Sequence, residues 1–148
     1  MGIDVSRFHN VEVDRKNKRK EIGVPDDSFV LLFVGELNKR KNHEVVIKAL
    51  AKLKNPNIYY IICGQGPLEN YLKQIITELN LEKQVKLLGF REDVNEIYKA
   101  ADVFVFPSYR EGLPVSLMEA MASGLPVICS NIRGNNDLIE HGHGGYSV

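Results

Sequence analysis

The sequence has no excess of charge of either sign. Lys and Arg together number 19, as do Asp and Glu, so the formal net charge is zero. Without a global positive field the chain is not expected to attract nucleic acid, and we predict no nucleic-acid partner. With 44% hydrophobic and 26% charged residues, the composition also argues against a disordered chain or a fibrous repeat.

Cysteine and long apolar stretches are scarce. Cys63 and Cys129 are the only cysteines, and each ends a predicted strand without belonging to a CxxC pair. We interpret both as small buried residues of a protein in a reducing compartment. No apolar run approaches the roughly 20 residues of a membrane helix, and the first residues do not resemble a signal peptide. These features predict a cytoplasmic protein.

Metal-ligand and triad patterns are missing as well. The only local histidine pair is His141 and His143, on a glycine-rich segment without a third donor at the usual spacing. No Ser/His/Asp or Cys/His arrangement has sequence support. We therefore expect no metal ion and no cofactor.

Short apolar runs alternate with amphipathic segments along the chain. The predicted strands are 29–34, 58–63, 85–88, 103–106, 126–129 and 146–148. The predicted helices are 43–54, one beginning near Pro67, 93–100, 114–123 and 135–140. Strands alternating with helices indicate right-handed βαβ crossovers. The predicted fold is therefore α/β, a Rossmann-like parallel sheet with helices on both faces.

A basic run, Arg15 to Lys20, precedes the first predicted strand. We interpret it as a solvated face or linker, with attraction to an anionic membrane surface as the alternative. Residues 1–28 are accordingly predicted to form a hinge or linker and lead-in segment, and residues 29–148 the domain itself. Both ends look cut, because the chain opens as if continuing a turn and stops as a strand begins.

The unusual residues follow the predicted strands. Glycine- and charge-rich loops come after five of the strands, at 35–41, 64–67, 89–93, 107–114 and 130–136. The carboxyl ends of parallel strands share one edge of the sheet, and open α/β sheets bind their ligands at that edge. We expect the functional site there.

The strongest constellation on this edge is a pair of carboxylates, Glu111 and Glu119, around a predicted helix start. Unpaired backbone N–H groups from about Leu113 to Leu117, with the helix dipole, would stabilise a phosphate. The flanking carboxylates would accept hydrogen bonds from sugar hydroxyls. A phosphate between sugar hydroxyls describes a nucleotide-sugar. The alternative is that Glu119 is a helix-surface residue and Glu111 a turn residue.

Two further loops offer anion or nucleotide contacts. Lys41 follows Gly35 by six positions and could reach an anion, or it could lie in water beside Lys39 and Arg40. The segment 64–66, Gly-Gln-Gly, begins like a dinucleotide fingerprint, but Glu69 occupies the third glycine position. A dehydrogenase is therefore disfavoured.

Together these residues resemble the C-terminal domain of retaining GT-B glycosyltransferases of group 1, the family four class. The matching blocks are Gly2-Ile3-Asp4 with Phe8, Phe33-Val34-Gly35 with Lys41, Gly64-Gln65-Gly66-Pro67, Leu88-Gly89-Phe90, Ala101-Asp102, Pro107-Ser108, Glu111 with Glu119, and Gly124-Leu125-Pro126-Val127. Several blocks in the family's order are more specific than any one motif.

The resemblance implies a role for each matched residue. Glu111 would contact the donor-sugar hydroxyls and Glu119 the ribose, while Lys41 would neutralise the diphosphate as charge builds on it. Phe90 and Arg91 would border the base. The remaining implied contacts are glycine turns and backbone groups at Gly35, Gly64, Gly112, Leu113, Pro114, Val115 and Ser116. Glu36 stands where the family often has an arginine, so Arg40 or Lys39 would have to replace that charge.

The resemblance also implies what this chain does not hold. The acceptor would be bound by an N-terminal domain absent from this sequence, and helices would follow the last strand. We predict a donor-binding domain of a retaining hexosyltransferase, in bacterial polysaccharide or glycoconjugate synthesis, inactive as an isolated fragment. The bound substrate would be a nucleotide-diphosphate sugar of UDP or GDP type. A nucleotide-sugar epimerase of the same fold and a non-catalytic nucleotide-binding module are the alternatives.

Overall fold

A parallel sheet forms the centre of the computed structural model, which describes Phe8 and residues 12–107, 115–129 and 145–147. The strands are β1 (Phe29–Val34), β2 (Ile58–Cys63), β3 (Val85–Gly89), β4 (Val103–Phe106), β5 (Val127–Cys129) and β6 (Gly145–Ser147). Their order across the six-stranded sheet is β3-β2-β1-β4-β5-β6, and every neighbouring pair is parallel. This is the doubly wound order whose switch point lies between β1 and β4. The predicted Rossmann-like fold is confirmed.

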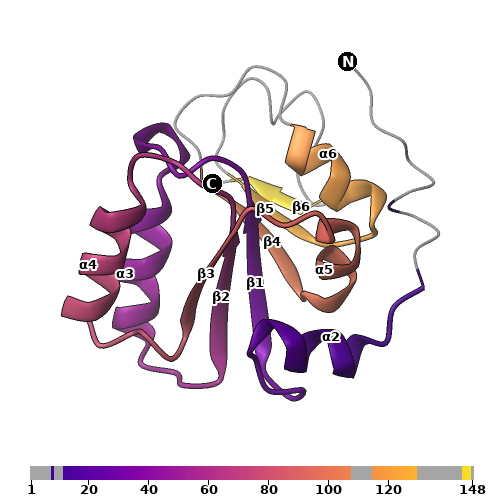
Figure 1. Ribbon diagram of the computed structural model, residues 1–148, viewed down its shortest axis with the longest axis horizontal. Helices are drawn as coiled ribbons and strands as arrows, with labels where there is room; N and C mark the ends of the chain where they lie inside the picture. Colours follow the sequence, from indigo (N-terminus) through magenta and orange to yellow (C-terminus); the bar gives the residue numbers. More distant parts are fainter. Residues whose placement is uncertain (1–7, 9–11, 108–114, 130–144, 148) are drawn as a thin grey trace.

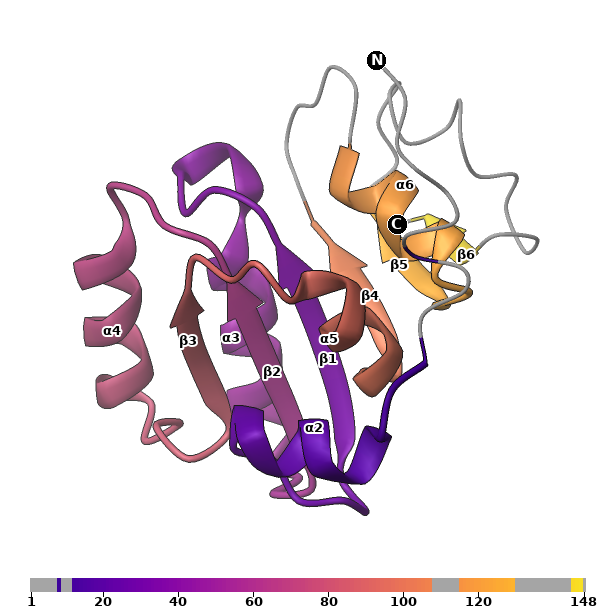
Figure 2. The ribbon, with the colours of Figure 1, turned by 45° about the vertical axis from the view of Figure 1, so that its right-hand side comes forward.

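Helices cover both faces of this sheet. They are α2 (Arg15–Ile22), α3 (His43–Leu53), α4 (Glu69–Glu78), α5 (Val94–Ala100) and α6 (Val115–Ala122), with a short 3₁₀ helix η1 (Lys39–Lys41). Helices α3 and α4 lie on one side of the sheet, and α2, α5 and α6 lie on the other (Figures 1 and 2). Central strands covered on both faces bury consecutive residues, as Tyr60, Ile61 and Ile62 of β2 do.

The predicted element boundaries agree with the structure to within about two residues wherever the chain is described. Helix α4 begins at Glu69, two residues after Pro67. Helix α5 has Asp93 at its N-cap position without a side-chain cap. The Asp93 carboxylate instead accepts hydrogen bonds from Arg91 and Lys18. The predicted helix 135–140 lies outside the described residues.

The interpretation of the basic run as a solvated face is correct for Arg15, Lys16 and Lys20, which are exposed, but the run is not a linker. The run forms most of α2, which Asp14 caps by accepting a hydrogen bond from the Asn17 backbone and which Gly23 ends in the left-handed conformation. Lys18 and Arg19 are buried. The helix packs on α5 along the lower part of the molecule in Figure 1. Lys18 and Arg19 are therefore not available to contact a membrane surface.

A polar network closes the amino end of the sheet beneath α2. The Arg19 guanidinium donates to the carbonyls of Ala100, Asp26 and Ser28, and to Asp102 at 2.8 Å. Asp102, just before β4, also accepts from the first buried N–H of β1, that of Val30, at 2.7 Å. A buried guanidinium is tolerated because its donors find acceptors. The network joins α2, β1, α5 and β4.

No helix in the described ranges is long and apolar enough to span a membrane.

Candidate functional site

A cavity of about 390 Å³ lies at the carboxyl ends of β1, β2 and β3. It is lined by residues from the ends of these strands and from the start of α5, namely Val34, Gly35, Glu36, Cys63, Gly64, Gln65, Phe90, Arg91 and Val94. Four residues predicted from separate motifs, Gly35, Gly64, Phe90 and Arg91, therefore meet in one space. Its volume falls within the range of small-molecule sites.

The glycines at this edge are required by backbone packing. A Cβ on Gly64 would lie 1.7 Å from the Gly35 carbonyl oxygen, and one on Gly66 would lie 2.5 Å from that of Leu37. The two loops are also joined by a 2.9 Å hydrogen bond from the Leu37 N–H to the Gln65 carbonyl. The close approach holds the loops after β1 and β2 against each other. Residues of both loops line the cavity.

Lys41 is the last residue of η1, in the loop after β1. Its side chain is 8% exposed, with Cε close to Gly35 and Nζ 5.5 Å from the centre of the Phe106 ring. An ammonium above a ring face is stabilised by the ring quadrupole. Lys39 and Arg40, the predicted substitutes for the family's arginine, are exposed on η1, as is Glu36 before it.

His43 packs behind Lys41 on an aromatic layer. Its ring meets Phe33 edge-on at 4.3 Å, and Phe33 stacks on Phe106 at 5.9 Å. The ring nitrogen Nε2 lies 3.4 Å from the Glu36 carbonyl, and Nδ1 has no partner within the described part of the chain. Burial, with a smaller contribution from the Lys41 charge, lowers the pKa of His43 to about 4. Because of this lowered pKa, the His43 ring is uncharged at neutral pH. The sequence analysis did not single out this residue.

Arg91 is held rigidly at the cavity wall. Its Nε and Nη2 atoms donate to the two oxygens of Asp93 at 2.9 and 2.8 Å, and Nη2 also reaches Glu21 at 3.1 Å. The bond from Arg91 is the largest cause that holds the Asp93 pKa well below its usual range, and Lys18 adds to it. A bidentate arginine pair fixes direction as well as charge. Arg91, which was predicted to border the base, is thereby joined to α2 through Glu21.

Glu119 lies on α6, where its half-buried carboxylate faces α5. Its Oε1 accepts a hydrogen bond from the Tyr98 hydroxyl at 3.1 Å. Tyr98 is buried and stands one helical turn after Val94, which lines the cavity. Sequence reasoning missed Tyr98. The only signal for it was this four-residue spacing on α5, which places both residues on one helix face.

Cys63, at the end of β2, is buried in the wall of the same cavity. Burial raises the pKa of its thiol to about 12, so it stays protonated. This agrees with the interpretation of Cys63 as a small buried residue. Cys129 ends β5, as predicted.

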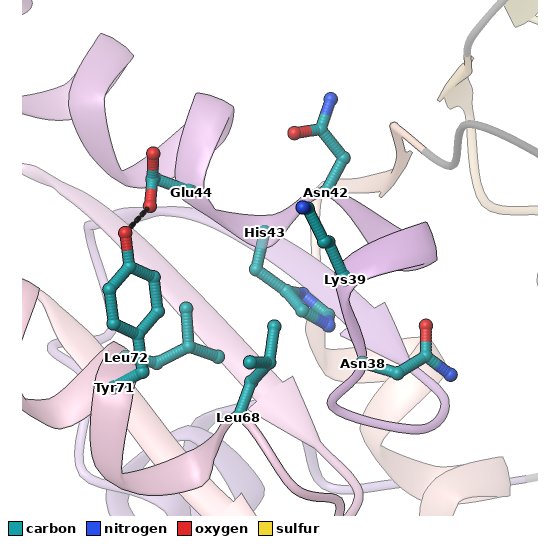
Figure 3. Close-up of a pocket in the computed structure, with 8 residues that line it drawn as sticks. All are labelled: Asn38, Lys39, Asn42, His43, Glu44, Leu68, Tyr71 and Leu72. Atoms are coloured by element: carbon teal, nitrogen blue, oxygen red, sulfur yellow. Dashed lines mark hydrogen bonds between the residues drawn. The ribbon is translucent and has the colours of Figure 1, made fainter.

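A second cavity, of about 360 Å³, lies between the N-terminal ends of α3 and α4 (Figure 3). Residues that line it include Asn38, Lys39, His43, Leu68 and Tyr71. The Tyr71 hydroxyl donates to Glu44 at its edge. Lys39 therefore lines this space and not the cavity at the strand ends. Apart from Lys39, none of the residues named in the predicted donor contacts lines it.

Several predicted contacts fall where the chain is not described. Glu111, Gly112, Leu113 and Pro114 lie outside the described residues, as do His141 and His143. Val115 and Ser116 open α6. Within the described ranges, no group of three or more His, Cys, Asp or Glu side chains could hold a metal ion.

Comparison with known proteins identifies the family. The family model of the glycosyl transferases group 1 matches residues 14–148. The chain belongs to this family. It is 38% identical over 152 residues to an Escherichia coli UDP-Gal:alpha-D-GlcNAc-diphosphoundecaprenol alpha-1,3-galactosyltransferase, covering 99% of this chain and 39% of the relative. The chain thus spans about two fifths of the curated relatives it matches.

Solved structures of similar proteins share its fold. Anabaena Alr3699/HepE in complex with UDP-glucose matches with a TM-score of 0.88 and 30% identity, covering 99% of this chain and 42% of that one. The C-terminal domain of the Francisella tularensis group 1 protein LpcC matches with a TM-score of 0.80 and 27% identity, over 99% and 80% of the two chains. The predicted family and the GT-B domain fold are confirmed.

Proposed function

We propose that this chain is the nucleotide-sugar donor domain of a retaining glycosyltransferase. The observation that carries the proposal is the cavity at the carboxyl ends of β1, β2 and β3, where Gly35, Gly64, Phe90 and Arg91 meet. Two similar proteins support the ligand class, because Anabaena HepE was solved with UDP-glucose and the E. coli relative is named for UDP-Gal. The proposed ligand is a UDP- or GDP-sugar.

Each part of such a donor has a matching surface. Phe90, 68% exposed at the cavity rim, offers a face on which the base would stack. Glu119 would accept hydrogen bonds from the ribose hydroxyls. Lys41, close to Gly35, would neutralise the diphosphate, and the start of α6 would add the positive end of a helix dipole. We include no metal ion in this proposal.

The chemistry follows from these placements. As the bond between sugar and diphosphate breaks, negative charge builds on the leaving phosphate. Fixed cationic and N–H groups lower the barrier by stabilising that charge. Glu111 would hold the sugar hydroxyls during transfer. The acceptor and the rest of the machinery would belong to an N-terminal domain, so this chain alone would bind a donor without transferring its sugar efficiently.

The parent protein would act in bacterial polysaccharide or glycoconjugate synthesis. Relatives named for such pathways support this setting, among them an Erwinia amylovora amylovoran biosynthesis glycosyltransferase that is 41% identical over 126 residues. We propose a cytoplasmic protein, with peripheral contact to the membrane through the exposed cations of α2, Arg15, Lys16 and Lys20.

Calorimetry with UDP, GDP and UDP-sugars tests the proposal. The folded chain should bind at least one of them at or below millimolar concentration, and EDTA should leave the affinity unchanged. Glu119→Ala should weaken binding about tenfold or more, because hydroxyl bonds to a charged acceptor are lost. Glu78→Ala, which removes an exposed carboxylate of α4, is the matched control and should bind like the wild type. No binding of any of these ligands by a folded chain would refute the proposal.

A further inference from the structure

Tyr98 is a buried tyrosine whose hydroxyl reaches the proposed ribose-binding carboxylate. It stands in α5, and its hydroxyl lies 3.1 Å from Glu119 Oε1 and 3.1 Å from the Ser116 carbonyl oxygen, both on α6. A tyrosine hydroxyl carries one proton, so these two oxygens compete for it. The Ser116 carbonyl lies inside α6, where the helix itself supplies an N–H partner four residues on. The charged carboxylate is the stronger acceptor.

The Tyr98 ring is fixed from three directions. Phe8 meets it edge-on at 5.8 Å, Phe104 of β4 lies 5.8 Å away at a tilted angle, and α5 holds its backbone. The side chain is fully buried. Burial is the main cause that raises the pKa of Tyr98 well above its usual value, and the Glu119 charge adds to it. The hydroxyl therefore stays protonated, and remains a donor, at neutral pH.

Glu119 has more freedom without this bond. Its side chain is half-buried and long, and an unrestrained glutamate can occupy several rotamers at the helix surface. A fixed donor on Oε1 selects among these rotamers and so fixes the direction of the carboxylate. Preorganised groups bind more tightly because less entropy is lost on binding.

We propose that the Tyr98 hydroxyl positions the Glu119 carboxylate for the ribose hydroxyls of the nucleotide. Tyr98 is thus a positioning residue, acting through Glu119 rather than touching the ligand. The inference rests on the proposed function, in which Glu119 binds the ribose. It also gives α5 a double role, because Val94 lines the cavity and Tyr98, one turn later, orients the Glu119 carboxylate of α6.

Calorimetry on Tyr98→Phe with two ligands tests this inference. The dissociation constant for UDP should rise about five- to tenfold, whereas that for 2′,3′-dideoxy-UDP, which has no ribose hydroxyls, should be unchanged from the wild type. In a Glu119→Ala background, Tyr98→Phe should add nothing. A purely structural role would weaken both ligands alike, and that result would overturn the inference.

Tyr60→Phe is the matched control. Tyr60 is a fully buried tyrosine of β2 whose hydroxyl has no hydrogen-bond partner among the residues described. Its substitution should change neither affinity. If Glu119→Ala weakens UDP but Tyr98→Phe does not, the inference fails and the proposed function stands. If the wild type binds neither ligand, both fail.

A measurement on the wild type remains available should Tyr98→Phe not fold. A buried, hydrogen-bonded tyrosine hydroxyl proton exchanges slowly with water and can be observed by NMR. We expect a nuclear Overhauser contact between this proton and the Glu119 side chain, in the free chain and with UDP bound. Absence of the contact in the UDP complex would overturn the inference.

Discussion

The amino and carboxyl edges of the sheet differ in how far their side chains are buried and hydrogen-bonded within the protein. At the amino edge, the buried Arg19 is 2% exposed and its donors are matched by Asp102 and by three backbone carbonyls. At the carboxyl edge, Phe90 is 68% exposed beside a cavity and His43 keeps a buried ring nitrogen without a described partner. One edge satisfies its polar groups internally, and the other leaves surface for a ligand.

This difference predicts that the amino edge contributes mainly to stability and the cavity rim mainly to nucleotide binding. Substitutions in the buried network of the amino edge should destabilise the domain and change nucleotide affinity only through unfolding. Substitutions on the cavity rim should change affinity and leave stability nearly as it was. The following changes are ordered from the largest expected effect to the smallest.

Arg19→Met should cause the largest loss of stability. It leaves Asp102 and the carbonyls of Ala100, Asp26 and Ser28 without their shared donor. Breaking a buried ion pair by removing one partner costs about 3–5 kcal/mol. Urea unfolding followed by circular dichroism measures the change. Arg15→Ala, which removes an exposed partner of the same Asp102, is the control and should cost under about 1 kcal/mol. Equal costs for the two variants would contradict the assignment.

His43 should make stability depend on pH between about 4 and 6.5. Its folded-state pKa of about 4 lies below the ordinary value of 6.5, so the unfolded chain binds the extra proton first as the pH falls. Stability is therefore full above pH 6.5 and falls towards pH 4, by up to about 3 kcal/mol. Urea midpoints of the wild type and of His43→Gln, taken across this range, isolate the contribution. Parallel pH profiles would show that His43 is not the cause.

Asp93 does not contribute to the pH dependence in this window, because the ordinary pKa of an Asp carboxyl already lies at its lower end. Its pKa is lowered below the ordinary carboxyl value, so the stability it contributes is lost only as the pH falls below about 4. The pairing of Asp93 with Arg91 is therefore intact throughout the range in which His43 is expected to act.

Phe90→Ala should reduce nucleotide affinity with almost no change in stability. Stacking of a base on an aromatic side chain contributes about 1–3 kcal/mol, so the dissociation constant for UDP should rise about tenfold. Phe29→Ala offers the opposite case, because Phe29 is 44% exposed at the first position of β1, on the amino edge. It should bind UDP normally. Calorimetry, with thermal unfolding as the stability measure, distinguishes the two, and equal affinity losses would remove the base-stacking role from Phe90.

The sheet and most helices were predictable because their signals are local. A continuous apolar run such as 29–34, or an amphipathic segment such as 43–54, needs no distant partner to be recognised. Helix α2 was missed because Ile22 is its only strongly apolar residue. Its caps, Asp14 and Gly23, were readable signals. The burial of Arg19 could not be predicted from the sequence, because its partner Asp102 is 83 residues away.

The site was predictable in part for a similar reason. The strand-end rule brought Gly35, Gly64, Phe90 and Arg91 to one edge, and the structure places them around one cavity. The reason for Gly64 could not be predicted, because it depends on the carbonyl of Gly35 in a neighbouring loop. Tyr98 and His43 were missed because their roles depend on side-chain contacts with other elements, which a single sequence does not show.

NMR titration of the ¹⁵N-labelled chain with UDP tests the central claim most directly. The account predicts that the backbone amides of Gly35, Gly64, Phe90, Arg91 and Glu119 shift in proportion to binding. The amides of α2 around Arg19, on the opposite edge, should stay in place. Shifts centred on α2, or in the cavity between α3 and α4 with none at the ends of β1, β2 and β3, would contradict it.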